Sequence, residues 1–227
     1  MPTPAPRRAL LSWSGGKDSC LALQRLRADP AVRVEGLLTT VTDAYDRVSM
    51  HGVRRALVEA QAEAAGLPLR VVPIPPGCGN AEYERRSGAA LAAWAAEGGH
   101  AVAFGDLYLA DVRAYRERLV AERAPGLTPL FPLWGEDTAA LARRFLADGF
   151  RATLVCVDPR QVPAALCGRA YDGRLLGELP AGADPCGERG EFHTFVHGGP
   201  VFARPVAVAA GAVVERDGFW FADLLPG

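Results

Sequence analysis

Leu10-Leu11-Ser12-Trp13-Ser14-Gly15-Gly16-Lys17-Asp18-Ser19 is the stretch that decides how this 227-residue chain folds. An apolar run stops at two adjacent glycines and continues into a helical pattern, which predicts a strand, a tight turn and a helix N-terminus. The glycines let the backbone approach an anion, and the helix points free N–H groups and its positive dipole end at the same place. Ser14 and Ser19 add hydroxyl donors, so the turn is a candidate phosphate site. It is too short for the GxxxxGK[ST] cradle, and an ordinary Ser-Gly turn is the alternative.

Strand and helix patterns alternate outward from this turn. Apolar or β-branched runs predict strands, and apolar residues at helical spacing predict the helices between them. The strands are expected at 9–13, 34–41, 69–74 and 100–104, and the helices at 17–27, from residue 52 to Gly66, from Asn80 past Trp94, and at 109–123, with Asn80 as a helix cap and a polar loop over 42–51. This order predicts an α/β fold with a doubly wound parallel sheet, a Rossmann-like nucleotide-binding domain. Its ligands bind outside the carboxyl ends of the strands.

The second half of the chain is less regular. Pro125, Pro129 and Pro132 predict a stiff, extended connector over 124–133, so we expect a domain boundary between residues 124 and 125. A helix at 137–147, a strand at 152–158 and a short helix within 161–171 follow. The remainder alternates Gly and Pro turns with short apolar runs. Residues 1–124 are therefore expected to bind the nucleotide, and residues 125–227 to form a smaller C-terminal α+β domain that binds the substrate.

Composition narrows the class of protein. The chain is 49% hydrophobic and 22% charged, with a net charge of −1, so no electrostatic argument favours nucleic acid or an anionic membrane as a partner. The five cysteines are odd in number and form no CxxC pair, which argues against a disulfide framework and against a zinc or iron–sulfur site. Residues 1–8 are proline-rich without an apolar segment, and no run of about 18 apolar residues occurs. These features predict a cytoplasmic protein with no membrane segment; a homodimer is left open.

A second signature lies near the C-terminus. Residues 184–196, Asp-Pro-Cys-Gly-Glu-Arg-Gly-Glu-Phe-His-Thr-Phe-Val, combine carboxylates, a histidine and aromatic residues around two glycines. A loop of this kind can present Glu188, Glu191 and His193 to a cleft, where carboxylates bind ammonium and a histidine moves protons. The alternative is a turn before a strand whose apolar residues are core and whose polar residues are solvated.

Several motifs together carry a family resemblance. Ser14-Gly15-Gly16-Lys17-Asp18-Ser19 resembles the PP-loop of the N-type ATP pyrophosphatases. With Ser49-Met50-His51-Gly52-Val53-Arg54, Gly105-Asp106-Leu107, Pro132-Leu133-Trp134 and the 184–195 segment in this order, nearly the whole chain resembles the diphthine–ammonia ligase family of adenine nucleotide alpha hydrolase-like proteins. Arg189 departs from that pattern, in which Asn is usual, so its effect on substrate choice is open.

The resemblance implies an ATP-dependent amide-forming ligase that uses Mg²⁺ and ammonia. A substrate carboxylate would attack the α phosphorus of ATP, pyrophosphate would leave, and ammonia would then displace AMP. The acceptor is diphthine of elongation factor 2 or a small metabolite. Frequent Ala, Arg and Gly suggest a GC-rich, bacterial source, and since bacteria lack diphthamide, the composition favours the metabolite.

The resemblance also implies roles for individual residues. The catalytic set is Lys17, Asp18, Glu188, Glu191 and His193. Nucleotide binding is expected at Ser12, Ser14, Gly15, Gly16, Lys17, Asp18, Ser19, Thr39, Thr40, His51, Gly105, Asp106 and Arg113, and Mg²⁺ binding at Asp18 and Asp106. Arg113 and Arg116 are expected to bind phosphate or the substrate carboxylate, with surface salt bridges as the alternative. For Asp18 the alternative is a helix cap, and for Lys17 a solvated helix residue.

Two other functions remain open on the sequence. A tRNA-modifying PP-loop enzyme is one, although the chain lacks a CxxC pair and net positive charge. A nucleotide-binding sensor without turnover is the other, although the acidic C-terminal segment fits it poorly.

Overall fold

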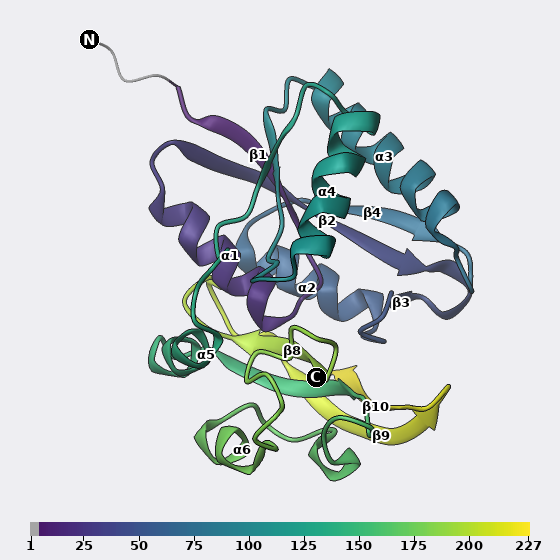
Figure 1. The fold of residues 1–227 in the computed structure, drawn as a ribbon, viewed down its shortest axis with the longest axis vertical. Helices are drawn as coiled ribbons and strands as arrows, with labels where there is room; N and C mark the ends of the chain where they lie inside the picture. The colour runs from purple at the N-terminus through teal and green to yellow at the C-terminus, as the bar shows by residue number, and fades with distance from the viewer. Residues whose placement is uncertain (1–4) are drawn as a thin grey trace.

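The computed structural model describes residues 5–227, so the first four residues of the proline-rich N-terminal segment lie outside it. Its first sheet contains five parallel strands in the order β4-β2-β1-β5-β6 (Figure 1). They are β1 (Arg7–Ser12), β2 (Val32–Thr42), β4 (Leu69–Ile74), β5 (Ala101–Ala103) and β6 (Thr128–Leu130). The order reverses between β1 and β5, which makes that boundary the switch point where ligands of such sheets bind. The predicted doubly wound α/β fold is confirmed.

Helices cover both faces of this sheet. Leu11 and its inward neighbours pack with α1 (Lys17–Ala28) and α2 (Arg55–Ala65). Leu10 and Val102 point the other way and pack with α3 (Asn80–Ala96) and α4 (Ala110–Arg123). The alternation follows from the period of two along a strand, which sends successive side chains to opposite faces.

Three local expectations in this half are wrong. Gly79, rather than Asn80, occupies the cap position of α3, and no side chain caps it. The expected polar loop over 42–51 contains a 3-10 turn (Asp43–Tyr45) and the short strand β3 (Arg47–Val48), which pairs antiparallel with the end of β2. The expected connector over 124–133 contains β6, which pairs with β5 and so belongs to the first sheet. The prolines leave the segment extended, and an extended edge segment is able to pair with a neighbouring strand.

The second half forms a four-stranded antiparallel sheet in the order β8-β7-β10-β9. Its strands are β7 (Arg151–Val157), β8 (Phe192–Gly198), β9 (Val208–Arg216) and β10 (Phe219–Pro226), with α5 (Thr138–Ala147) and α6 (Gly173–Glu178) packed against them (Figure 1). The expected helix within 161–171 is only a 3-10 turn (Ala164–Leu166), because the Asp158 carboxylate accepts bonds from Arg160 and Gln161 and holds that segment in a turn. Helix α6 was not predicted, since Gly173 and Gly177 interrupt its pattern.

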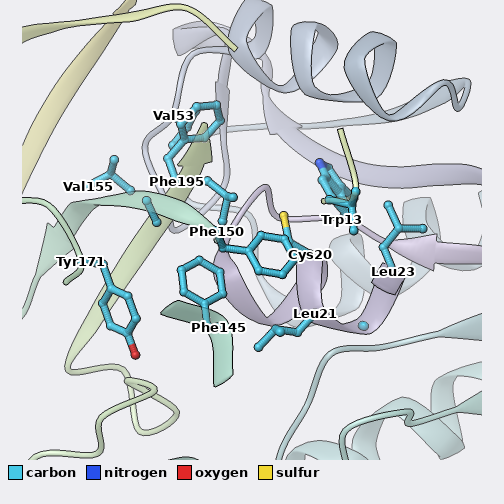
Figure 2. Close-up of a cluster of buried hydrophobic side chains, with 14 of the residues drawn as sticks. Trp13, Cys20, Leu21, Leu23, Val53, Phe145, Phe150, Val155, Tyr171 and Phe195 are labelled. Carbon is cyan, nitrogen blue, oxygen red and sulfur yellow. The ribbon is translucent and has the colours of Figure 1, made fainter. Parts of the chain in front are cut away.

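The layer of α1 and α2 lies between the two sheets (Figure 1). One hydrophobic cluster runs through it: Trp13 and Cys20 from the first half lie near Phe150 and Phe195 from the second (Figure 2). All five cysteines are free, which agrees with the predicted absence of a disulfide framework. Within residues 5–227, no helix has the length and apolar character needed to cross a membrane.

Candidate active site between the two sheets

The glycine-rich turn after β1 is held by contacts on both sides. Gly15 has a φ of +78°, and a Cβ added there would lie 2.6 Å from Gln61 Oε1. A Cβ on Gly16 would lie 3.1 Å from the carbonyl oxygen of Thr194 in β8. The turn therefore requires glycine for its conformation and for its close packing against α2 and the second sheet.

Gln61 was missed by the sequence analysis, and it links the two sheets through this turn. Its side-chain amide is fully buried, donates to the carbonyls of Gly15 (2.9 Å) and Val196 (2.6 Å), and accepts from Trp13 Nε1 (3.0 Å). Val196 N–H also donates to the Gly15 carbonyl at 2.9 Å. The sequence does indicate that Gln61 is buried, because it lies four residues after Leu57 and three after Val58, on the apolar face of its helix.

Lys17 and Asp18 form a buried ion pair at the start of α1. Lys17 is 2% exposed, and its ammonium lies 2.8 Å from Asp18 Oδ2 and donates to the Cys186 carbonyl. Its backbone N–H donates to Thr194 Oγ1 at 3.0 Å. Burial raises the pKa of Asp18, and the Asp18 carboxylate raises the pKa of Lys17 against the opposing effect of burial. Lys17 is thus not a solvated helix residue, and α1 has no side-chain cap.

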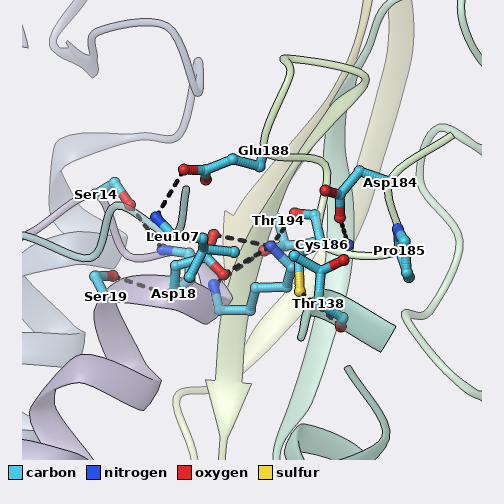
Figure 3. A network of polar contacts seen from close by, with 12 residues as sticks. Ser14, Asp18, Ser19, Leu107, Thr138, Asp184, Pro185, Cys186, Glu188 and Thr194 are labelled. Carbon is cyan, nitrogen blue, oxygen red and sulfur yellow. Dashed lines mark hydrogen bonds and ion pairs between the residues drawn. The ribbon is translucent and has the colours of Figure 1, made fainter. Parts of the chain in front are cut away.

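Three carboxylates line one cavity of about 280 Å³ beside the turn: Asp18, Asp106 and Glu188. Glu188 accepts the N–H of Leu107 at 2.7 Å (Figure 3). Burial, with smaller contributions from Asp18 and Asp106, raises the pKa of Glu188 to about 7. Burial also raises the pKa of Asp106. A carboxyl group that titrates near neutrality can give or take a proton at the pH of a cell.

Asp18 and Asp106 are chemically suited to magnesium, which takes one or two carboxylates together with phosphate oxygens. Asp106 Oδ2 is buried and has no hydrogen-bond partner among residues 5–227. That part of the chain contains no cluster of three or more His, Cys, Asp or Glu arranged to hold a metal ion. The two carboxylates therefore fit a magnesium ion whose remaining ligands are oxygens of a bound phosphate, rather than an ion held by protein side chains alone.

A pair of histidines from the two halves lies over the turn. His51 precedes α2 and His193 lies on β8, with their ring centroids 4.3 Å apart. Burial, helped by the Lys17 ammonium, lowers the pKa of His51 to about 4. Burial, followed by His51 and Lys17, also lowers the pKa of His193. Both imidazoles are neutral at pH 7, so each can donate one hydrogen bond and accept another.

A larger cavity of about 750 Å³ adjoins the first. Thr39 and Thr40 line it at the end of β2, whereas Tyr83, Ser87, Tyr115 and Arg116 line it from α3 and α4. The two cavities share Ser12, Ser14, Met50, His51, Phe104 and Arg116 as lining residues. The volume falls in the range of pockets that enclose ligands of nucleoside size and larger.

Most of the expected site residues line these two cavities. Ser12, Ser14, Gly16, Lys17, Asp18, Ser19, Thr39, Thr40, His51, Gly105, Asp106, Glu188 and His193 do so. Gly15 lines neither cavity, because it packs against the Gln61 side chain. Ser14 and Ser19 bond within the turn: Ser14 Oγ accepts the Gly16 N–H, and Ser19 Oγ donates to the Gly16 carbonyl.

The structure does not bring Glu191 or Arg113 into either cavity. Glu191 is 1% exposed, and its carboxylate accepts the N–H groups of Asp184 (2.8 Å) and Arg189 (2.9 Å), so it holds the 184–191 loop together. Arg113 pairs with Glu117 and lies against the rings of Phe131 and Trp134. The 184–196 segment combines features of the two alternatives, a loop that presents polar side chains to a cleft and a turn that leads into a core strand. Phe192, Phe195 and Val196 are core, but Glu191 and Thr194 are buried rather than solvated.

Comparison with known proteins agrees with this architecture. Residues 7–127 match the family model described as the diphthamide synthase N-terminal domain, and residues 137–224 match the diphthamide synthase C-terminal domain. A protein of Danio rerio named diphthine–ammonia ligase is 29% identical over an alignment of 229 positions, which spans 90% of this chain and 88% of that protein. The two matches cover the two halves of the chain, both of which line the smaller cavity, and the chain belongs to the diphthamide synthase family.

Proposed function

We propose that this protein is an ATP-dependent ligase that converts a carboxylate into an amide with ammonia and releases AMP and pyrophosphate. The observation that supports the proposal most strongly is the junction of two cavities at the glycine-rich turn. One cavity holds three carboxylates and Lys17, and the other has room for a nucleoside. The name of the Danio rerio relative supports the same class of reaction.

In this proposal residues 1–124 bind ATP, and residues 125–227 contribute side chains that act on ammonia. The backbone N–H groups of the turn and the N-terminus of α1 bind the phosphates that leave, and Thr39 and Thr40 face the adenosine. Asp18 and Asp106 would hold Mg²⁺, which offsets the charge of the phosphates when bound.

The reaction then proceeds in two displacements. An oxygen of the acceptor carboxylate attacks the α phosphorus, and the bond to the bridging oxygen breaks to release pyrophosphate. Ammonia attacks the activated acyl carbon, the bond to the AMP oxygen breaks, and Glu188 takes the proton that nitrogen loses. A pKa of about 7 suits this role, because a useful fraction of the group is ionised at neutral pH.

Two acceptor classes remain in the proposal. The name of the relative favours diphthine, whereas the composition of this chain favours a small metabolite. Arg189 bonds to the Gly182 carbonyl at 2.8 Å and pairs with Glu191, so any effect of this residue on the choice of substrate would act through the 184–191 loop.

The test is to supply the protein with Mg²⁺, ammonium and ATP labelled at the α phosphate, with and without a metabolite extract, and to identify the labelled nucleotide. We expect the labelled product to be AMP, and its amount to increase when a fraction of the extract is added. Formation of ADP would contradict the mechanism.

Asp18→Asn should lower AMP formation by about 100-fold or more, because it removes a metal ligand and the Lys17 partner. Glu191→Gln should keep ATP affinity within about threefold, since Glu191 lies outside the cavities. The exposed Asp148→Asn is the matched control.

A further inference from the structure

Arg116 is the charged residue that connects the two cavities. It lies on α4, lines both cavities, and places its guanidinium 5.1 Å from the centre of the Phe104 ring. Its Nη1 donates to the Tyr83 hydroxyl at 3.3 Å. With 23% of the side chain exposed, the guanidinium is largely withdrawn from water but remains reachable from the cavity.

This guanidinium is incompletely paired. Its Nε lies 3.7 Å from Asp106 Oδ2, beyond hydrogen-bond distance, and neither atom has a hydrogen-bond partner within residues 5–227. Ser87 Oγ, which lines the larger cavity from α3, is also buried without a partner in that range. Buried polar groups are normally satisfied, so unsatisfied groups at residues that line these two adjoining cavities indicate a ligand that completes them. For a fixed guanidinium, that ligand is an anion with planar oxygens.

The position of Arg116 in the sheet indicates which anion this is. Strand β2, which carries Thr39 and Thr40, lies on one side of β1, and β5, which precedes α4, lies on the other. With adenosine on the β2 side and the leaving phosphates at the turn after β1, the β5 side is free for the molecule that attacks the α phosphorus. Arg116 lines this side and also reaches the carboxylate cavity where that phosphorus would lie.

We propose that Arg116 binds the reacting carboxylate of the acceptor, with Tyr83 beside it, so that the β5 side of the larger cavity is the acceptor subsite. This inference rests on the proposed ligase function. It also explains product release, because the carboxylate that pairs with Arg116 becomes an uncharged amide and loses the ion pair.

The experiment uses the full chain saturated with α,β-methylene-ATP and Mg²⁺, an analogue that blocks attack at the α phosphorus. Acetate is the probe and acetamide its uncharged counterpart, and binding of each methyl group is followed by saturation-transfer NMR. We expect transfer to acetate and not to acetamide. Arg116→Gln should lower the acetate signal by about tenfold or more, Arg116→Lys should retain part of it, and Arg118→Gln, a surface change on the same helix, should leave it unchanged.

Calorimetry of ATP-analogue binding to the same variants distinguishes a failure of the proposed ligase function from a failure of the acceptor subsite. If the unmodified chain does not bind the analogue, the proposed function fails. If it binds the analogue but acetate transfer is absent, equals that of acetamide, or is unchanged in Arg116→Gln, the acceptor subsite is wrong. A loss of analogue affinity of about tenfold or more in a folded Arg116→Gln variant would make Arg116 a nucleotide residue and also overturn the subsite.

A competition arm identifies the source of the carboxylate. Glutarate and the peptide acetyl-Gly-Glu-Gly-amide are each added to the acetate complex. Displacement by glutarate alone assigns the subsite to free small molecules, and displacement by both assigns it to carboxylates that a protein can also carry. Displacement by neither contradicts the subsite.

Discussion

Glu188 is the single residue whose surroundings change its chemistry most clearly. Its carboxyl group has a pKa of about 7, chiefly because it is withdrawn from water, with Asp18 and Asp106 nearby. In the unfolded chain the group has its ordinary pKa, so between about pH 4.5 and 7 the folded state binds more protons than the unfolded state. The free energy of unfolding from this group therefore falls as the pH rises through that interval.

Glu188→Gln removes this titration while keeping an oxygen that can accept the Leu107 N–H. We expect the variant to unfold like the unmodified chain at pH 4, where the carboxyl is mostly protonated in both the folded and the unfolded state. At pH 8 it should be more stable by about 1 kcal/mol, a figure reduced for the partial exposure of the group. Urea unfolding at the two pH values measures the difference, with the exposed Glu59→Gln as control. Equal or lower stability of Glu188→Gln at pH 8 would contradict the raised pKa.

At the scale of elements, α2 positions the glycine-rich turn after β1, although it contributes no residue to the cavity that holds the three carboxylates. Gln61 spans from this helix to the turn and to β8, and its three hydrogen bonds are fully buried. The turn is thus held by a helix that follows it by some forty residues and by a strand from the other end of the chain.

Gln61→Leu keeps the volume of the side chain but leaves Trp13 Nε1 and the Val196 carbonyl without this partner. Because unpaired buried groups cost about 1–3 kcal/mol each, we expect the free energy of unfolding to fall by about 2–5 kcal/mol. ATP affinity should fall as well, since the turn loses its support. Gln24→Leu is the matched control, because the Gln24 amide bonds only to Asp148 near the surface. A Gln61→Leu variant as stable as that control would show that the three bonds do not hold the turn.

At the scale of the whole molecule, the two halves share a core. Trp13, Leu21 and Leu57 of the first half and Phe145, Phe195 and Leu175 of the second belong to one buried cluster. Arg47 and Arg54 also pair with Asp223 of β10 at 2.9 and 2.6 Å, and this pairing lowers the pKa of Asp223 to about 2. A core that is continuous across two sheets should unfold as one unit.

Phe195→Ala tests this cooperativity, because Phe195 is fully buried in β8. The substitution should cost about 3–5 kcal/mol and lower the urea midpoint of β1 by as much as that of β8. Pulsed hydrogen exchange in urea, followed by mass spectrometry of peptides from the two strands, measures both midpoints. A shift confined to β8 would show that the halves unfold independently. Val213→Ala, on the exposed face of β9, is the control.

Local patterns in the amino-acid sequence determined the α/β alternation, the parallel sheet and the glycine-rich turn, because strand and helix periods and glycine turns act over a few residues. Most of the site residues expected from the sequence line the two cavities. The local patterns misjudged the segment 124–133, since its pairing with β5 depends on a strand distant in the chain. Arg113 and Arg116 are both cationic and three residues apart, and only the packing of α4 decides that Arg116 lines the cavities.

Only the tertiary structure determined which residues that are distant in the sequence contact one another at the site. Lys17 N–H meets Thr194 Oγ1 across 177 residues, and Gln61 meets Val196 across 135. Such contacts arise when two sheets bury a common core, and no local spacing records them. The raised pKa of Glu188 and the lowered pKa values of His51 and His193 have the same origin, since they follow from burial between the two halves.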